Sequence, residues 1–315
     1  MPELNPSVLC PACKCEQVEN LELISISDLT AAYKKDTGMN VQPEFANGPG
    51  EIRLCKCGQC KLEFFYPLIS GSQRFYAELA SKQLYYSTER WEFSRAKELL
   101  NDPGKSILDV GCGDGYFLST LPHAQKMGLE FNSVAASKAR SKNLLVKEVD
   151  LKGLTGAKFD VITVFHVLEH IAEPLRFCQE ALALLNSKGL FVISVPNNDA
   201  FIGQDMFHAG NAPPHHVLRW NAGSLTYLCK LLPIELINLE REPLGSQHYF
   251  LYRRVKILNY LRSRGMRLPL MKRSLKTFVT YKFANLLTKL SLLVNSKPAS
   301  QWREGFSILA VYQKN

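Results

Sequence analysis

The residues 107–118, ILDVGCGDGYFL, constrain the fold more than any other stretch of this chain. An apolar run ends in Asp109, a loop follows with glycine at every second position, and a second apolar stretch then begins. Glycine permits a positive φ and carries no Cβ, so the backbone of such a loop can approach a ligand closely. A glycine-rich turn between a strand and a helix is typical of α/β domains that bind nucleotide-like ligands.

From about residue 104 onward, short apolar runs alternate with amphipathic stretches. This alternation predicts an α/β fold with a doubly wound, mostly parallel sheet and helices on both faces. The runs that read as strands are KSILDV, AQKMGLE, LLVKEVD, FDVITVF and GLFVISV, with PIELINLERE and GFSILAVYQ as candidates for a sixth and a seventh. The helical candidates between them are GYFLSTLPH, NSVAASKARSK and PLRFCQEALALLN.

The polar groups around the loop indicate which ligand it would hold. Gly111, Gly113 and Gly115 follow the first strand of the sheet, at the carboxyl edge where such folds bind ligands. Asp109 would repel a pyrophosphate but would attract an ammonium group, directly or through water. Glu130 ends the second strand, where a carboxylate accepts hydrogen bonds from both hydroxyls of a ribose. An amino group, a ribose and no pyrophosphate describe S-adenosylmethionine; the alternative is a tight turn in an unrelated α/β domain.

Cysteines gather near the N-terminus. The chain carries two C-x-x-C pairs, CPAC at Cys10 and Cys13 and CGQC at Cys57 and Cys60. Together they form a tetrahedral thiolate set for Zn(II), and four thiolates leave no open position, so the expected role is structural. Thiols without a metal are the alternative. Two further cysteines lie beside the pairs and could substitute as ligands: Cys15 and Cys55.

The motifs ILDVGCGDGYFL, GLEFN, VKEVDL and FDVITVFHVLEHI resemble the class I S-adenosylmethionine-dependent methyltransferases. The resemblance covers about residues 104–200 and the final GFSILAVYQK, and it implies a seven-stranded sheet with an antiparallel last strand. It also implies that Asp150 or Leu151 lies near the adenine, with Asp150 bonding the exocyclic amine. By the same pattern, Phe165 and His166 line the methionine end.

A narrower resemblance concerns the order of the segments. A cysteine knuckle, then C-x-x-C with KLEFFYP, then an aromatic linker and the core resembles methyltransferases of deoxysugar and surface-polysaccharide biosynthesis. In deoxysugar C-methyltransferases a zinc-binding domain helps cover the active site. Their large extra C-terminal domain has no counterpart here, which argues against C-methylation of a nucleotide sugar. The organisation predicted is a zinc-ribbon-like domain at 1–67, an aromatic helical linker or lid at 68–103 that contains Tyr85, Tyr86 and Trp91, and a methyltransferase domain at 104–315.

Histidines are the candidate bases, because methyl transfer to a hydroxyl requires one and histidine titrates near the working pH. His170 follows the fourth strand, and His215 and His216 follow the fifth. In the C-methyltransferases a Tyr-His-Glu-His stretch brings a histidine to the sugar; here it reads PPHH, so the resemblance aligns His216 with the last histidine and His215 with the glutamate. His170 matches a second active-site histidine. Bracing a helix, shaping a loop or binding phosphate remain open as structural roles, and Glu169 is expected to support local hydrogen bonding.

Charge is unevenly distributed along the chain. The formal net charge is +9, yet residues 244–302 contain no Asp or Glu and twelve Lys and Arg. This part, a predicted basic helical insert at 244–303, mixes apolar and basic residues at helical spacing. Three interpretations stay open: a helical lid or homodimer surface with a solvated basic face, a peripheral contact of 248–300 with an anionic membrane surface, and, least favoured, nucleic-acid binding.

These patterns together predict a cytoplasmic enzyme that transfers a methyl group from S-adenosylmethionine. The N-terminus MPELNPSVLCPACKC has no apolar core of a signal peptide, and an odd number of cysteines fits metal or free thiols. The expected acceptor is an oxygen of a sugar or glycan that is nucleotide-linked, lipid-linked or polymeric. The alternatives are RNA, a quinone-like lipid precursor, and a non-catalytic scaffold. Against RNA, FHVLEH stands where an amide-reading N-P-P-Y motif would follow the fourth strand.

Overall fold

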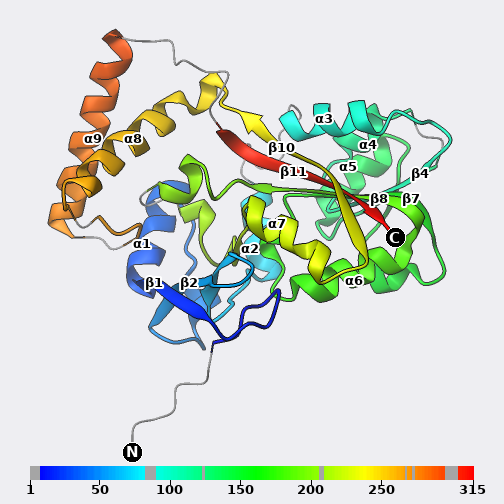
Figure 1. Ribbon diagram of the computed structural model, residues 1–315, viewed down its shortest axis with the longest axis horizontal. Helices are drawn as coiled ribbons and strands as arrows, with labels where there is room; N and C mark the ends of the chain where they lie inside the picture. The colour runs from blue at the N-terminus through cyan, green and yellow to red at the C-terminus, as the bar shows by residue number, and fades with distance from the viewer. Residues whose placement is uncertain are drawn as a thin grey trace, which may run out of the picture.

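The computed structural model contains two sheets, flanked by helices (Figure 1). It describes residues 8–81, 90–122, 125–205, 209–266, 268–271, 274–294 and 304–315. The linker tyrosines Tyr85 and Tyr86 lie outside the described residues. Within the described segments, no helix is both long enough and apolar enough to cross a membrane.

The larger sheet has seven strands in the order β10-β11-β8-β7-β4-β5-β6. Neighbours pair in parallel except for β11, which is antiparallel to both β8 and β10. The prediction of a mostly parallel seven-stranded sheet with an antiparallel last strand is therefore confirmed. Its strands are β4 (Ser106–Val110), β5 (Gln125–Leu129), β6 (Leu145–Lys147), β7 (Phe159–Phe165), β8 (Leu185–Pro196), β10 (Ile234–Pro243) and β11 (Glu304–Lys314).

Both faces of this sheet are covered, because successive side chains of a strand point to opposite sides. On one face Ile107 and Val161 pack under α3 (Trp91–Leu99), α4 (Tyr116–Thr120) and α5 (Ser133–Ser141). On the other face Leu108 and Ile162 pack against α6 (Pro174–Leu184) and α7 (Ala222–Tyr227). Figure 1 shows α3, α4 and α5 above the sheet and α6 and α7 below it. The alternation of apolar residues in the strands thus specifies two separate cores.

The smaller sheet has four antiparallel strands in the order β1-β2-β3-β9. Three come from the cysteine-rich region: β1 (Val18–Ser25), β2 (Glu51–Cys57) and β3 (Glu63–Tyr66). The fourth, β9 (Leu218–Arg219), comes from the chain that follows β8. Helix α1 (Ile26–Thr37) covers this sheet with Leu29 and Tyr33 buried. The described part of the cysteine-rich region, residues 8–67, is therefore joined to the larger domain through a shared sheet, rather than attached by a linker alone.

The remaining elements lie outside the two sheets. Helix α2 (Gln73–Ala80) precedes α3, and α8 (Tyr249–Ser263) and α9 (Leu275–Val294) lie between β10 and β11 in the chain. Short 3-10 turns complete the fold: η1 (Gln42–Phe45), η2 (Leu151–Leu154), η3 (Leu168–His170), η4 (Phe201–Gln204), η5 (Ala209–Asn211), η6 (Leu228–Lys230) and η7 (Ser246–His248).

Candidate active site and cysteine cluster

The glycine loop after β4 takes a backbone course that only glycine suits. Gly111, Gly113 and Gly115 have φ of 75°, 56° and 75°, in the left-handed region. A Cβ on Gly111 would lie 2.5 Å from Val167, and one on Gly115 would lie 2.5 Å from a side-chain carbon of Leu144. The loop is therefore packed closely from below, while its upper side faces a cavity.

Asp109 lies below this loop and is buried. Its Oδ1 accepts a hydrogen bond of 2.7 Å from the Thr163 hydroxyl. Burial, reinforced by the nearby Glu130 carboxylate, raises the pKa of Asp109 to about 7 from its ordinary 3.8. A cation placed beside Asp109 would stabilise the ionised form, so the side chain is suited to an ammonium ligand.

Glu130, directly after β5, is fixed by backbone amides. Its Oε2 accepts from Gly113 N at 2.9 Å, and its Oε1 accepts from Asn132 N at 2.7 Å. Each carboxylate oxygen has a second lone pair, so the fixed carboxylate still has acceptor capacity for two hydroxyls. Burial raises the pKa of Glu130 above its usual range. This is the geometry that the ribose assignment requires.

One cavity of about 1500 Å³ connects these groups with the candidate bases. It exceeds the roughly 300–1,000 Å³ of an ordinary ligand pocket, which leaves room for a cofactor and a second molecule. Asp150 and Leu151 lie along it; Asp150 caps η2 by accepting from Gly153 N at 3.1 Å. Phe165 also lines it and packs edge-on against Phe117, with 4.8 Å between ring centroids. The structure thus brings the cofactor-site residues expected from the sequence to one cavity, except Gly115, which packs against Leu144 and Ala139 instead.

A buried ionic cluster lies where β7 ends. His166 Nε2 is 2.9 Å from Glu92 of α3, and His166 Nδ1 is 3.3 Å from Glu169 of η3. Although burial disfavours the charged imidazole, the two carboxylates raise the pKa of His166 to about 9. The ring is therefore an imidazolium at neutral pH and is not available as a base.

The other histidines gather beside Glu169. The ring centroids of His215 and His216 lie 4.3 Å apart, and those of His170 and His215 lie 4.6 Å apart. His170 is held between backbone carbonyls, with Nδ1 2.7 Å from the oxygen of His215 and Nε2 3.1 Å from that of His166. Both ring nitrogens of His170 are therefore directed at backbone carbonyls, which suits bracing of two loops better than taking a proton from a molecule in the cavity.

The tautomer of His216 follows from its neighbours. His216 Nδ1 is 3.1 Å from Asn211 Oδ1. The amide nitrogen of Asn211 donates to Asn198 Oδ1 and to the carbonyl of Ile202, so the oxygen of Asn211 must accept. His216 Nδ1 consequently carries the hydrogen, and Nε2 carries the lone pair of the neutral ring.

The local contacts expected of Glu169 are mainly ionic. Its carboxylate is buried, and neither oxygen accepts a well-aligned hydrogen bond from a described residue. Its Oε1 lies 3.9 Å from His216 Nε2 and forms an ion pair with His166. Although burial opposes ionisation, His166 and His170 lower the pKa of Glu169 below its usual range. Glu169 is therefore an anion facing the basic nitrogen of His216.

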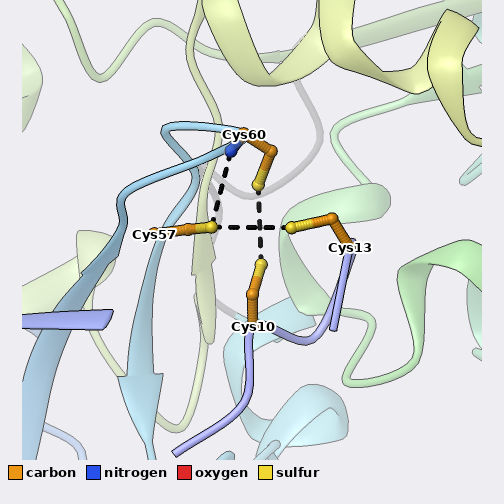
Figure 2. Close-up of side chains that lie close together, drawn as sticks. All are labelled: Cys10, Cys13, Cys57 and Cys60. Carbon is orange, nitrogen blue, oxygen red and sulfur yellow. Dashed lines mark hydrogen bonds between the residues drawn. The ribbon is translucent and has the colours of Figure 1, made fainter. Parts of the chain in front are cut away.

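The cysteine pairs converge on one point (Figure 2). The sulfurs of Cys10 and Cys60 are 3.5 Å apart, as are those of Cys13 and Cys57, and all four lie within 4.8 Å of one another. Tetrahedral thiolates around zinc, with Zn–S near 2.3 Å, have sulfurs about 3.8 Å apart. The cluster is thus compatible with a zinc site. It lies against the larger domain's core, in contact with side chains such as Trp220.

The extra cysteines occupy other positions. Cys55 donates towards Asn20 Oδ1 at 3.4 Å, and Cys15 accepts from Gln17 N at 3.3 Å. Burial of Cys55 raises the pKa of its thiol to about 11. Neither sulfur belongs to the group of four. In the glycine loop, burial also raises the pKa of Cys112, in keeping with a packing role.

Several site residues could not be recognised in the sequence. Glu92 lies in the linker, Asn211 lies in the loop after β8, and Glu242 lies at the end of β10. Glu242 is buried beside the cavity and accepts from the backbone amides of Phe306 and Ser307. No motif marks these three, because each reaches the site only through the tertiary fold.

The sheet order and the cofactor-side geometry define a class I methyltransferase fold. A family model described as a methyltransferase domain matches residues 84–268, more than half of the chain. The chain therefore belongs to this methyltransferase family.

Individual relatives match a part of the chain. A probable S-adenosylmethionine-dependent methyltransferase of Mycolicibacterium smegmatis is 29% identical over 42% of this chain and 53% of its own length. A mitochondrial ubiquinone biosynthesis O-methyltransferase of Candida albicans is 27% identical over 49% of this chain and 55% of its own. The chain thus spans about half the length of these curated relatives.

Solved structures give distant likenesses. An S-adenosylmethionine-dependent methyltransferase of Archaeoglobus fulgidus has a TM-score of 0.46 at 16% identity, covering 76% of this chain and 100% of that one. A coclaurine N-methyltransferase bound to N-methylheliamine and S-adenosylhomocysteine has a TM-score of 0.43 at 13% identity, covering 70% of this chain and 71% of that one.

Proposed function

We propose that this chain binds S-adenosylmethionine and transfers its methyl group to a hydroxyl oxygen, with His216 as the general base. The observation that carries the proposal is the contact of His216 Nε2 with the buried Glu169 carboxylate at 3.9 Å, in the same cavity as Asp109 and Glu130. When bound, the cofactor supplies an electrophilic methyl on a sulfonium; the residues of the chain do the rest.

The cofactor assignment rests on charge and hydrogen bonding. Asp109 attracts the ammonium, Glu130 accepts from the ribose hydroxyls, and the second oxygen of Asp150 accepts from the adenine amine. Among the described residues, the cavity lining contains one basic Lys or Arg side chain, Arg90, and eight carboxylates. The carboxylates are Glu92, Asp109, Asp114, Glu130, Asp150, Glu169, Glu180 and Glu242. This acidic lining favours a cationic cofactor over a dinucleotide, and it disfavours RNA as the acceptor.

The proton of the acceptor hydroxyl has a defined destination. As the carbon–sulfur bond breaks and the new oxygen–carbon bond forms, the hydroxyl proton passes to His216 Nε2. Asn211 holds the ring in the required tautomer, and Glu169 stabilises the imidazolium that results. His166, already charged, keeps Glu169 ionised. The products are a methyl ether and S-adenosylhomocysteine, and the proton leaves later to solvent.

The acceptor that we propose is a hydroxyl of a sugar or glycan. The cavity that contains His216 is also lined by groups that bind hydroxyls and ring faces, among them Gln73, Tyr76, Gln247 and His248. Any phosphate carried by the acceptor would have to stay outside the acidic lining.

A phenolic quinone precursor is the second candidate. Two observations favour it: relatives are named as ubiquinone biosynthesis O-methyltransferases, and part of the lining is aromatic, as at Phe306.

A panel of acceptors tests the proposal. The full chain is incubated with methyl-labelled S-adenosylmethionine and with nucleotide sugars, lipid-linked oligosaccharides, polyprenyl dihydroxybenzoates or transfer RNA. Label on a sugar hydroxyl is the expected result. Label on the benzoate alone would select the second candidate, and label on RNA alone would contradict both.

The matched variant for this assay is His216→Ala. Transfer of label should be lost in this variant while cofactor binding is retained. Retained transfer would remove His216 from the reaction and leave the cofactor assignment standing.

A further inference from the structure

Helix α9 turns its large apolar side chains towards solvent. Seven of them, here called the apolar stripe, are between 47% and 82% exposed: Leu275, Phe278, Val279, Phe283, Leu286, Leu290 and Leu293. Apart from the neighbours Phe278 and Val279, they recur at intervals of three and four residues, so they lie along one side of the helix. A continuous exposed stripe of this kind, unlike scattered apolar residues, marks an interaction site.

The buried side chains on the opposite side of α9 are small, and two of the three are polar. Thr277, Ala284 and Thr288 are the buried residues of the helix, and Ala284 packs against Leu258 of α8. The hydroxyl of Thr288 is satisfied within the helix by the carbonyl of Ala284 at 2.7 Å. A helix on the surface of a water-soluble domain buries its apolar side and exposes its polar side. In α9 this arrangement is reversed.

Positive charge borders the apolar stripe. Lys276, Lys282 and Lys289 are exposed, and helical geometry places Lys276 at one edge of the stripe and the other two beside Phe278 on its opposite side. The surrounding segment, residues 244–302, contains no acidic residue. The face therefore combines hydrocarbon with cations that are not neutralised by acids of the same segment.

We infer that the apolar stripe and its lysines form a docking surface for an anionic lipid bilayer. The apolar side chains enter the boundary between head groups and acyl chains, and the lysines contact lipid phosphates. Because lysines recur along the whole length of α9, the helix lies in the plane of the membrane rather than crossing it. The inference is independent of the chemistry in the cavity.

Charge decides between lipid and a second copy of the chain. Pairing of two α9 helices through their stripes would bring lysine edges together, whereas helix pairs of this kind need opposite charges beside the seam. An anionic membrane supplies the missing counter-charge. Nucleic acid would satisfy the lysines but would leave seven apolar side chains in water.

The docking surface is fixed to the body that holds the cavity. Arg254 of α8 contacts both carboxylate oxygens of Asp205 at 2.8 Å, and its guanidinium lies 4.8 Å from the ring of Tyr281 in α9. Helix α8 begins directly after His248, which lines the cavity. In Figure 1, α8 and α9 extend beside the sheet with α9 outermost. Docking would therefore hold the body that contains the cavity at the membrane surface.

Cosedimentation with vesicles tests the inference. The full chain is mixed with vesicles of phosphatidylcholine alone or of an equimolar mixture with phosphatidylglycerol, at low and high salt. Binding to the mixed vesicles is expected, with little binding to phosphatidylcholine. Removing Lys282 and Lys289 together, as K282Q and K289Q, should weaken binding about five-fold per lysine.

Variants of the stripe have a matched control. Phe283→Ser with Leu290→Ser should weaken binding to mixed vesicles at least about ten-fold, because both side chains are half exposed and hold no core. Leu23→Ser with Leu145→Ser removes apolar side chains of equal exposure from β1 and β6 and should leave binding unchanged.

Four outcomes would overturn the inference. The chain could fail to bind mixed vesicles, or the stripe variant could bind as the control does. Light scattering could instead show a dimer that only the stripe variant dissociates, which would assign the face to a second copy. Salt-sensitive binding to an RNA duplex without binding to vesicles would assign it to nucleic acid.

Discussion

His216 Nε2 lies 3.9 Å from the buried Glu169 Oε1, although the two residues are separated by 46 positions in the chain. Asn211 fixes the tautomer of the ring, and the imidazolium of His166 keeps the carboxylate charged. A basic nitrogen of defined orientation, facing a buried anion, is suited to general-base catalysis.

Replacing this base should slow methyl transfer without weakening the affinity for S-adenosylmethionine. His216→Ala should lower kcat about 100- to 10,000-fold, because the acceptor hydroxyl then has no positioned base. Glu169→Gln keeps the shape of the side chain but removes its charge, and it should lower kcat at least about ten-fold. Measurements of kcat on the acceptor identified in the panel check the loss of transfer. Calorimetric titration of S-adenosylmethionine checks that its binding is retained.

His170 provides the contrasting variant. Since its ring nitrogens both face carbonyls, His170→Gln should lower the thermal midpoint of unfolding. It should lower kcat less than His216→Ala does. A greater loss of kcat for His170→Gln than for His216→Ala would exchange their roles.

Cofactor affinity should depend on pH through Asp109. Its pKa near 7 means that the folded protein keeps a proton that an unfolded chain releases near 3.8, so this group costs stability as pH rises from about 4 to 7. An ammonium ligand requires the ionised form and displaces that proton. The Kd for S-adenosylmethionine should therefore be about 20-fold weaker at pH 5.5 than at pH 7.5.

Asp109→Asn is the control for this pH profile. The variant should bind weakly at every pH and show a flatter profile. A wild-type Kd that is constant between these pH values would show that Asp109 does not face the ammonium.

The ribose assignment predicts a selective loss at Glu130. Glu130→Ala should weaken the binding of S-adenosylmethionine about 10- to 100-fold, the usual effect of losing hydrogen bonds to a charged group. Glu148, after the next strand, bonds only to Ser133 and Arg140 among the described residues and does not line the cavity. The Glu148→Ala variant should therefore bind S-adenosylmethionine with normal affinity in calorimetric titration. Equal affinities of the two variants would refute the assignment.

The cysteine cluster should hold one zinc ion for each chain. Elemental analysis should find it in the purified protein, and Cys13→Ser should lose it and unfold at a lower temperature, since binding to such sites contributes directly to folding. Cys15→Ser, two residues away but outside the cluster, should keep the metal. Metal retained by Cys13→Ser and lost by Cys15→Ser would show that the ligand set is wrong.

The sequence predicted what is local or periodic. The strand, the glycine loop and Glu130 lie within 24 residues, so their geometry follows from one strand–turn–helix–strand unit. The seven strands and the two cysteine pairs were likewise visible as patterns. Glu92 and Glu242 were not, because their roles arise only when α3 and β10 meet His166 in the folded protein.

The apolar spacing in α9 shows a different limit. Leu275, Phe283, Leu286 and Leu290 predicted a helix, and a helix is present. The spacing could not show which side faces inward, and here Ala284 and Thr288 are buried instead. Periodicity identifies a shared face, whereas tertiary packing decides what that face contacts.

The most direct test of the account is a crystal structure of the chain with S-adenosylhomocysteine. The account predicts the amino group beside Asp109, the ribose hydroxyls within hydrogen-bonding distance of both Glu130 oxygens, and the sulfur facing the His216 end of the cavity. An empty cavity at saturating ligand, or an adenosyl group bound away from Glu130, would contradict it.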